Sequence, residues 1–238
     1  IDHHTYRFSR KAASEGLVVI DDPDSILRCT NKIYLAELLK ANRIATPDTV
    51  IVRSGGLDEL EERLGYPMVL KVPDGSFSLG VYKVENRQQL DQVARRLFRD
   101  SELLLGQAYT YTEFDWRVGV INGEALYVCQ YFMTKGHWQI YDHGSSGEVE
   151  GDHRTLAVGD APSNVIEMAL RAASLIGNGL YGVDLKETAD GILVIEVNDN
   201  PSIEHGVEDQ VIGDALYDRI IDEFLIRIES GKHQAAKK

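Results

Sequence analysis

The chain has 238 residues, of which 43% are hydrophobic, and a formal net charge of -13 at pH 7. This length suits one large domain or two small ones, and the negative charge argues against nonspecific binding to nucleic acid or to an anionic membrane surface. No apolar run reaches the length of a membrane span and no signal peptide is recognisable, while Cys29 and Cys129 lack metal-ligand spacing and favour a reducing, cytoplasmic compartment.

The first residues predict a helix from Tyr6 to Glu15 and a short strand from Leu17 to Ile20. One helix and one strand cannot form a sheet of their own. We therefore expect residues 1–30 to be the remnant of an upstream domain that is largely absent from this sequence.

The segment from Asp24 to Asn42 contains a predicted helix, with leucines at the spacing of a half-buried face. Lys32 lies near its start and, taken alone, is typical of a solvated surface lysine. A strand over residues 44–52 and a short helix around residues 57–64 are expected to follow.

An apolar strand over residues 66–73 carries Lys71 near its end, and a glycine-bearing loop follows it. Such a loop lets backbone N–H groups approach an anion closely, and the lysine supplies a charge for phosphate oxygens. The order differs from the Walker pattern, and a plain hairpin turn is an equally good interpretation of this segment. The loop residues are Gly75, Ser76, Phe77, Ser78, Leu79 and Gly80.

Asn86 is expected to cap a helix whose apolar face belongs to the core. Farther along, Asn122-Gly123 predicts the turn of a hairpin between strands over residues 115–121 and 124–131. Alternation places Asp115 and Arg117 on one face of the first strand. Together they form either a surface ion pair of little consequence or part of a site on that face.

Residues 134–155 form a long polar segment that is typical of a lid or binding loop. Its three histidines, His137, His143 and His153, have no fixed metal-ligand spacing and are interpreted as loop residues. Helices are expected over residues 163–176 and 211–228, and a tail over residues 231–238.

Glu196 interrupts an apolar strand, where a lone buried carboxylate is costly unless a cation or donor meets it. Asn198 shares its strand face, and Asp184 lies on the preceding strand. A three-residue loop over 189–191 would set Asp184 opposite Glu196, whereas a two-residue loop would turn it to the other face. We favour the three-residue loop, which predicts an all-oxygen site for Mg2+ or Mn2+. A hairpin with solvated acids is the alternative.

The order of these parts resembles the ATP-grasp superfamily and, within it, the RimK-type glutamate ligases, over roughly residues 31–228. The resemblance implies an α+β ATP-grasp fold, in which two α+β subdomains clasp ATP between antiparallel sheets. Residues 31–106 would form the subdomain with the glycine loop, and residues 107–230 the subdomain with the metal site. The matching stretches are NKIYLAELLKANRIATP, YPMVLKVPDGSFSLGV, LLLGQAY, DWRVGVING, GLYGVDLK and VIEVNDNPS.

The resemblance also implies a role for each candidate residue. Lys32 and Lys71 would hold the phosphates of ATP, and the loop from Gly75 to Gly80 would close over them. The ligands of Mg2+ or Mn2+ would be Asp184, Glu196 and Asn198.

The remaining implied roles concern the nucleoside and the transferred phosphate. The segment Gln107-Ala108-Tyr109 matches the hinge that receives adenine, where Gln107 replaces the usual acidic residue. The Gln107 amide oxygen can still accept a bond from the adenine amino group. Asp115 matches a nucleotide-contacting acid, and Arg117 matches an arginine near the γ-phosphate.

The implied reaction is ATP-dependent ligation of a carboxylate to an amine through an acylphosphate, with small-molecule or peptide substrates. RimK-type ligases carry an arginine-rich stretch after the second strand of the hairpin, whereas this chain reads CQYFMTKGHWQIYD there. Glutamate is therefore not assigned as the substrate, and a homo-oligomer is neither required nor excluded. A kinase-like ATP-grasp enzyme and a noncatalytic nucleotide-binding module are the alternatives.

Overall fold

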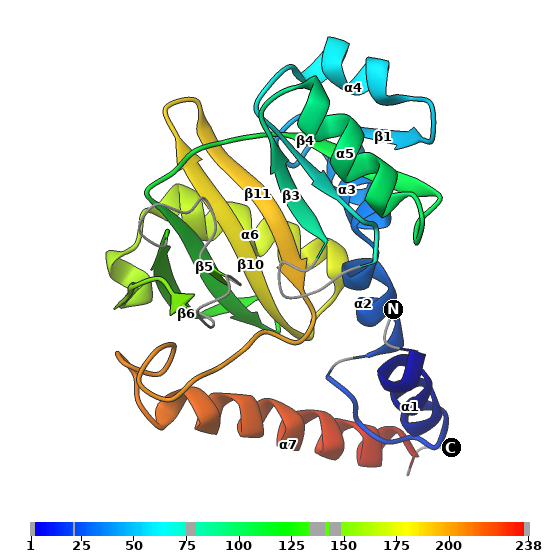
Figure 1. The fold of residues 1–238 in the computed structure, drawn as a ribbon. Coiled ribbons are helices and arrows are strands. Elements are labelled where there is room, and N and C mark those ends of the chain that lie inside the picture. The colour runs from blue at the N-terminus through cyan, green and yellow to red at the C-terminus, as the bar shows by residue number, and fades with distance from the viewer. Residues whose placement is uncertain (1–2, 21, 75–79, 134–140, 143–148, 236–238) are drawn as a thin grey trace.

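The structure is a computed structural model that describes residues 3–20, 22–74, 80–133, 141–142 and 149–235. Within these ranges the chain builds a four-stranded sheet and a five-stranded sheet, with helices packed against both (Figure 1). All strand pairs in the two sheets are antiparallel. This arrangement agrees with the predicted α+β class. No helix in the described part of the chain combines the length and the apolar character needed to cross a bilayer.

The smaller sheet turns one face to its helices and the other to the larger sheet. Its strands are β1 (Thr49–Arg53), β2 (Met68–Lys71), β3 (Val81–Val84) and β4 (Leu103–Ala108), in the spatial order β1-β4-β2-β3. The helices α4 (Leu57–Leu64) and α5 (Arg87–Leu97) cover the first face, where Met68 and Leu70 are buried. Since successive side chains alternate between faces, Lys71 and Gln107 lie on the other face.

Helix α5 begins as the sequence predicts. The Asn86 side chain accepts a 3.0 Å hydrogen bond from the backbone N–H of Gln89, and the Gln89 side chain accepts in return from the N–H of Glu85 at 2.8 Å. These bonds satisfy two N–H groups that a helix start leaves without intrahelical partners. The predicted apolar face packs on the sheet through Leu90 and Ala94.

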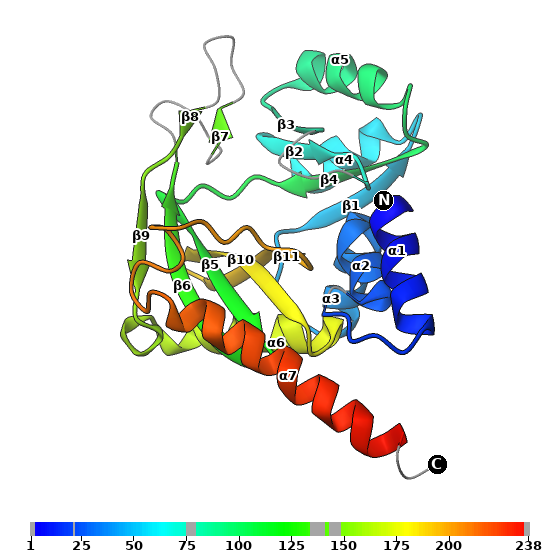
Figure 2. The ribbon, with the colours of Figure 1, turned by 90° about the horizontal axis from the view of Figure 1, so that it is seen from below.

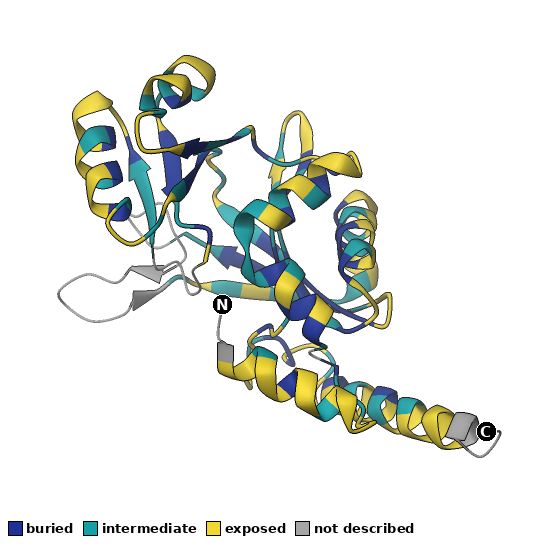
Figure 3. Cartoon of the chain, turned by 90° about the vertical axis from the view of Figure 1, so that its right-hand side faces the viewer, coloured by how far each residue is buried: buried dark blue, intermediate teal, exposed yellow. Residues whose placement is uncertain are grey.

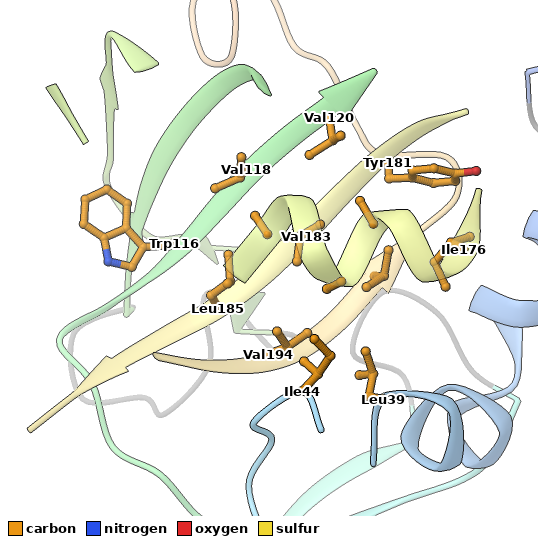
Figure 4. Packing of buried hydrophobic residues seen from close by; sticks show 14 of the residues in the cluster. Leu39, Ile44, Trp116, Val118, Val120, Ile176, Tyr181, Val183, Leu185 and Val194 are labelled. Atoms are coloured by element: carbon orange, nitrogen blue, oxygen red, sulfur yellow. The ribbon is translucent and has the colours of Figure 1, made fainter. Parts of the chain in front are cut away.

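The larger sheet has its core under helix α6. Its strands are β5 (Phe114–Ile121), β6 (Glu124–Phe132), β9 (His153–Leu156), β10 (Leu180–Thr188) and β11 (Gly191–Asn198), in the order β11-β10-β5-β6-β9. A short helix, η1 (Val158–Asp160), precedes α6 (Ser163–Ile176). Val118, Val183 and Val194 point toward α6 in a fully buried cluster (Figure 4).

The predicted hairpin turn between β5 and β6 is confirmed. Ile121 pairs with Glu124, and Asn122 and Gly123 have φ values of 48° and 78°. Positive φ at both central residues is the requirement of the turn that suits twisted hairpin strands. Trp116 and Val118 of β5 belong to the core under α6, so Arg117 between them lies on the sheet face that α6 does not cover.

The segment over residues 24–42 holds two helices, α2 (Pro23–Thr30) and α3 (Lys32–Ala41), and α3 is the predicted helix with Lys32 near its start. They are separated by Asn31, whose backbone is extended with φ -95° and ψ 107°. Its side-chain oxygen accepts from the N–H of Tyr34, and its amide donates to Asp74, both at 3.0 Å. Local competition by an asparagine side chain ends one helix and caps the next. As a result, Lys32 is the first residue of α3.

Helix α3 packs against the larger sheet. Leu35, Leu39 and the following Ile44 belong to the same buried cluster as Val194 of β11 (Figure 4), and the N–H of Val194 bonds to the carbonyl of Ala45 at 2.8 Å. The sequence assigns α3 to the smaller-sheet subdomain. The boundary between residues 106 and 107 stays a prediction.

Near the N-terminus, helix α1 (His3–Ser14) agrees with the prediction, but the predicted strand over residues 17–20 is wrong. A strand forms only when a neighbour satisfies its backbone groups, and no strand in the described ranges pairs with this segment. Of these residues only Ile20 is fully buried.

The long polar segment is only partly a loop. Residues 134–140 and 143–148, with His137 and His143, lie outside the described residues. A two-stranded ribbon pairs β7 (Tyr141–Asp142) with β8 (Val149–Glu150). His153 begins β9, which pairs with β6 through His153–Tyr131. Periodicity missed β9 because it lies at the sheet edge, where one strand face is not buried.

The last helix, α7 (Ala215–Ala235), begins later and ends later than the predicted helix over residues 211–228. Gly213 has a φ of 57°, outside the range of a right-handed helix, and turns precede it. Gly231 lies inside the helix rather than opening a tail, at a cost of about 1 kcal/mol relative to alanine. The C-terminal half of α7 extends beyond the sheets and is mostly exposed (Figures 2 and 3).

Candidate active site

The hairpin of β10 and β11 brings Asp184 opposite Glu196, as predicted, but by a different route. Thr188 pairs with Gly191, so the turn is the two-residue loop, and the predicted three-residue loop is wrong. The register shifts between Asp184 and Leu185, which leaves Ile195 without a partner. This bulge inserts one residue into β11 and cancels the reversal of faces that a two-residue loop would cause.

The bulge also explains how the apolar strand carries polar side chains. Val194 and Val197 are both fully buried on the core side, three positions apart rather than two or four. Glu196 and Asn198 therefore face away from the core, on the same side as Asp184. Asn198 donates from its amide to Asp184 Oδ2 at 3.1 Å, and its amide oxygen stays available as an acceptor.

Arg117 of β5 binds Asp184 with both arms of its guanidinium. Nε lies 2.7 Å from Oδ1 and Nη2 lies 2.9 Å from Oδ2. Burial disfavours the guanidinium charge, but the charge of Asp184 and these bonds outweigh it and raise the pKa of Arg117 well above its usual value. The guanidinium also lies 5.3 Å from the centre of the Tyr131 ring. Asp115 and Arg117 lie on one face of β5, as predicted. The ion pair of Arg117, however, is with Asp184 and not with Asp115.

Lys32 reaches the same face from α3. Its Nζ lies 2.7 Å from Glu196 Oε1, and the lysine side chain is only 11% exposed. Such burial excludes the solvated surface lysine that the sequence alone suggested. The acid of the apolar strand is thus met by a cation, as the cost of burying a lone carboxylate requires.

Lys71 of β2 lies on the facing side of the smaller sheet. Its Nζ donates to Gln107 Oε1 at 2.7 Å, and Gln107 Nε2 donates to Thr49 Oγ1 at 3.1 Å. Burial lowers the pKa of Lys71 to about 8; Lys32 and Lys186 add to this, and Glu196 opposes it. The Gln107 oxygen, which the sequence offered to adenine, accepts from Lys71 and keeps one lone pair for a further donor.

Asp115 pairs with a lysine that the sequence interpretation did not single out. Lys186 of β10 donates to Asp115 Oδ1 and to Thr112 Oγ1, and Thr112 donates to the same Asp115 oxygen at 2.9 Å. Burial raises the pKa of Asp115, while Lys186 and Thr112 lower it in part. Strand alternation was the available signal, because Lys186 follows Asp184 at a spacing of two.

The hinge and the glycine loop are described in part. Ala108 ends β4 and donates its N–H to the carbonyl of Asp48 at 2.8 Å. The ring of Tyr109 lies 4.3 Å from Nζ of Lys83, a second lysine that the sequence interpretation did not single out. Gly75, Ser76, Phe77 and Ser78 lie outside the described residues. Gly80 has a φ of 78°, and a Cβ there would lie 2.6 Å from a methyl group of Val72.

Both cationic and acidic side chains thus lie between the two facing sheets. Side chains from both sides line a cavity of ≈ 30 Å³, among them Lys32, Lys71, Gln107 and Glu196. Two carboxylates and an amide oxygen converge on one face of the larger sheet. The chemistry of this hard, all-oxygen donor set fits Mg2+ or Mn2+. In the described ranges no group of three or more His, Cys, Asp or Glu side chains comes together as a metal site. The opposing lysines and Arg117 suit a polyanion.

Comparisons with known proteins agree with this geometry. Residues 29–223 match the family model described as the RimK-like ATP-grasp domain. The α-aminoadipate–LysW ligase LysX of Saccharolobus solfataricus is 28% identical over 207 residues, which cover 81% of this chain and 69% of LysX. A probable α-L-glutamate ligase of Thioalkalivibrio sulfidiphilus is 27% identical over 199 residues, which cover 81% of this chain and 62% of that relative.

A solved structure resembles the whole fold. The D-alanine–D-alanine ligase of Bacillus anthracis complexed with ATP superposes with a TM-score of 0.69 and 18% identity. The superposition covers 95% of this chain and 76% of that chain. At 18% identity, the similarity shows only that this chain and the Bacillus anthracis ligase share a fold.

Proposed function

Because the chain belongs to the RimK-like ATP-grasp family, we propose that it is an ATP-dependent ligase that joins a carboxylate to an amine. The observation that carries the proposal is that Asp184 and Glu196 lie opposite each other on one sheet face and bind Arg117 of β5 and Lys32 of α3. The chain spans about two thirds of the length of the relatives named above. The activity therefore refers to the protein of which this chain forms at least the ATP-grasp part.

In the proposed site the metal ion is Mg2+, with Mn2+ as its equivalent, held by Asp184, Glu196 and Asn198. When bound, the ion screens the negative charge of the β- and γ-phosphates. Lys32 and Lys71 hold phosphate oxygens; the loop from Gly75 to Gly80, which the family resemblance also assigns to the phosphates, lies largely outside the described residues. The oxygen donor set and the alternation of cations and acids support these roles.

The same proposal names the residues that contact the nucleoside and the γ-phosphate. The hinge Gln107-Ala108-Tyr109 receives adenine, and Asp115 contacts the nucleotide beside it. Arg117 lies against Asp184 and is placed to neutralise charge on the γ-phosphate. The position of Arg117, on the sheet face that α6 does not cover and directly beside Asp184, supports this assignment.

The chemistry requires positioning more than acid–base catalysis. A substrate carboxylate oxygen attacks the γ-phosphorus and ADP leaves, which gives an acylphosphate. The amine then attacks the acyl carbon, phosphate leaves, and the amine loses a proton. A carboxylate is already ionised at neutral pH, so the first step needs no strong base. The protein brings anions together and offsets their repulsion.

We propose small acids, amino acids or peptides as substrates, in keeping with relatives whose names specify α-aminoadipate, glutamate and D-alanine. The net charge of -13 supports such partners over nucleic acid or an anionic membrane. Two unpaired, buried cysteines, Cys29 and Cys129, support a cytoplasmic location.

The proposal is tested by ADP release in a screen of acids and amines, with Mg2+ and ATP present. We expect ADP release to require both an acid and an amine. Hydroxylamine in place of the amine should trap the acylphosphate as a hydroxamate. Transfer of phosphate to an acceptor other than a carboxylate would identify a kinase-like enzyme instead. Tight ATP binding without ADP release under any pair would identify a noncatalytic module.

Nucleotide affinity is expected to fall roughly tenfold between pH 7 and pH 9 because of Lys71. With a pKa of about 8 in the ligand-free protein, Lys71 is mostly charged at pH 7 and mostly neutral at pH 9. Phosphate favours the charged form, so binding at pH 9 must first protonate the amine, which costs about one factor of ten. Calorimetric titration with ADP at the two pH values measures the effect.

The matched control for this prediction is Lys71→Arg, which keeps a cation at both pH values. Its ADP affinity should change less than twofold between pH 7 and pH 9. Equal ADP affinity of Lys71→Ala and the wild type at pH 7 would reject the phosphate role of Lys71 altogether.

A further inference from the structure

Lys186 is a charged residue of the larger sheet to which neither the family resemblance nor the sequence gives a role. It lies on β10, two residues after Asp184, and points to the same open face of the sheet. Its Nζ bonds to Asp115 Oδ1 and, at 2.7 Å, to Thr112 Oγ1. The side chains of Lys186 and Asp115 are only 13% and 16% exposed. An exposed ion pair contributes little, but this pair is largely shielded from water.

The three side chains connect different parts of the fold. Thr112 belongs to the segment of residues 109–113 that joins β4 of the smaller sheet to β5 of the larger one. Asp115 lies at the start of β5, and Lys186 lies on the neighbouring strand. The bonds of Lys186 therefore fasten the connecting segment to the larger sheet at the point where the chain leaves the hinge.

Both bonds to Asp115 end on the same oxygen. Lys186 and Thr112 donate to Oδ1, and in the described part of the chain Oδ2 accepts no hydrogen bond. The carboxylate is thus held by one oxygen, with the other left to accept from a ligand. Along β5, Asp115 lies between the hinge and Arg117, which is the stretch between the proposed adenine end and the phosphate end of the nucleotide.

The donors of ADP and ATP limit what Oδ2 can bind. At neutral pH the phosphates carry no N–H or O–H, so only the adenine amino group and the ribose hydroxyls donate. The hinge lies at the adenine end, and Asp115 follows it toward the phosphates. A ribose hydroxyl is the donor that fits this position.

We propose that Lys186 is a positioning residue of the nucleotide site, which orients Asp115 toward the ribose and fastens residues 109–113 to the larger sheet. The inference rests on the proposed ATP-binding function and adds to it a determinant of nucleotide recognition. Lys186 acts through Asp115 and Thr112. Its charge also reaches the phosphate-binding side, where it helps to lower the pKa of Lys71.

The test compares ADP with 2′,3′-dideoxy-ADP, each with Mg2+, by calorimetric titration of the full chain. A hydrogen bond to a charged group corresponds to about tenfold or more in affinity, so the wild type is expected to prefer ADP by at least that factor. Lys186→Met should lower the affinity for ADP about tenfold and leave the affinity for the dideoxy nucleotide nearly unchanged. The preference for ADP should then nearly vanish, which a general loss of stability would not produce.

Further variants make the result decisive. Lys186→Arg keeps two donors and should retain most of the preference, while Thr112→Val removes the second bond to Oδ1 and should lose part of it. Lys40→Met is the matched control, since Lys40 is exposed at the end of α3. If Lys186→Met fails to fold, the ratios for Lys186→Arg and Thr112→Val decide the question.

The possible failures are distinguishable. A wild type that binds neither nucleotide would overturn the proposed function. A wild type that binds both equally, or a Lys186→Met protein that keeps the full preference for ADP, would overturn the role of Lys186 and leave the ligase proposal in place. An unaltered preference in Thr112→Val alongside a lost one in Lys186→Met would confine the positioning to Lys186.

Discussion

Replacing Glu196 by Gln is expected to lower ADP formation by at least about 100-fold while leaving the fold intact. The change keeps the shape of the side chain but removes its charge from the proposed metal site. Loss of a partner behind a metal ligand typically costs 10- to 100-fold, so loss of a ligand's own charge should cost at least about as much. Steady-state ADP release at saturating Mg2+ measures the loss, and circular dichroism checks the fold.

The same variant makes a second, opposite change. Glu196 accepts from Lys32 at 2.7 Å, and the amide of Gln would release most of that charge interaction. Lys32 should then be freer to bind phosphate, so ADP affinity measured without Mg2+ should hold steady or rise. The enhancement of ADP affinity by Mg2+ should disappear. This pairing of outcomes separates a metal ligand from a residue that merely stabilises the site.

The control is Glu187→Gln, which alters an exposed acid on β10 that accepts from the Trp116 indole. It makes the same chemical change one strand away, and we expect turnover within about twofold of the wild type. Unchanged turnover in Glu196→Gln, or a persistent effect of Mg2+ on its ADP affinity, would count against the metal assignment.

The hairpin of β10 and β11 shows how far the sequence determines such an arrangement. Period-two alternation and the cost of burying a carboxylate correctly placed Glu196 and Asn198 on one face. The turn over residues 189–191 was wrong, because Thr188-Ala189-Asp190-Gly191 is compatible with two loop lengths. The compensating bulge at Ile195 depends on packing, since both Val194 and Val197 are drawn into the core under α6. Local sequence does not contain that information.

Other misses have similar causes. The sequence predicted the helix with Lys32 near its start but not the separate helix α2 before Asn31, whose side chain bonds to Tyr34 and to the distant Asp74. The second of these contacts exists only in the folded chain. Lys186 was missed although alternation places it beside Asp184, because a lysine on a strand is usually solvated. Its significance appears only when β5 lies next to β10.

The cations of the site were predicted to bind phosphates, whereas here they bind acids and an amide. Arg117 pairs with Asp184, Lys32 with Glu196, and Lys71 with Gln107. Partly buried charges need partners, and without ligands these side chains pair with other residues of the site. Mg2+ and a nucleotide offer replacements of both signs at once. Under the proposed function, we therefore expect metal and nucleotide to favour each other's binding.

Replacing Arg117 by Lys is expected to reduce turnover by roughly 100-fold or more, with a much smaller effect on ADP affinity. The guanidinium holds Asp184 with two parallel bonds at 2.7 and 2.9 Å, and an ammonium group lacks the planar fork that makes such a pair of bonds. Removing one preorganised donor from a developing charge typically costs 10²- to 10³-fold in rate. ADP lacks the γ-phosphate, so its binding should be largely spared.

Arg117→Ala tests whether Arg117 also neutralises the charge of Asp184. It leaves Asp184 partly buried without its cation, which should destabilise the ligand-free protein by about 3 kcal/mol. Because a divalent ion can replace the missing charge, Mg2+ with ADP should raise the melting temperature of this variant more than that of the wild type. Arg96→Lys, on the exposed face of α5, is the control and should change neither quantity. Normal turnover in Arg117→Lys, or an Arg117→Ala protein as stable as the wild type without ligands, would remove Arg117 from the proposed site.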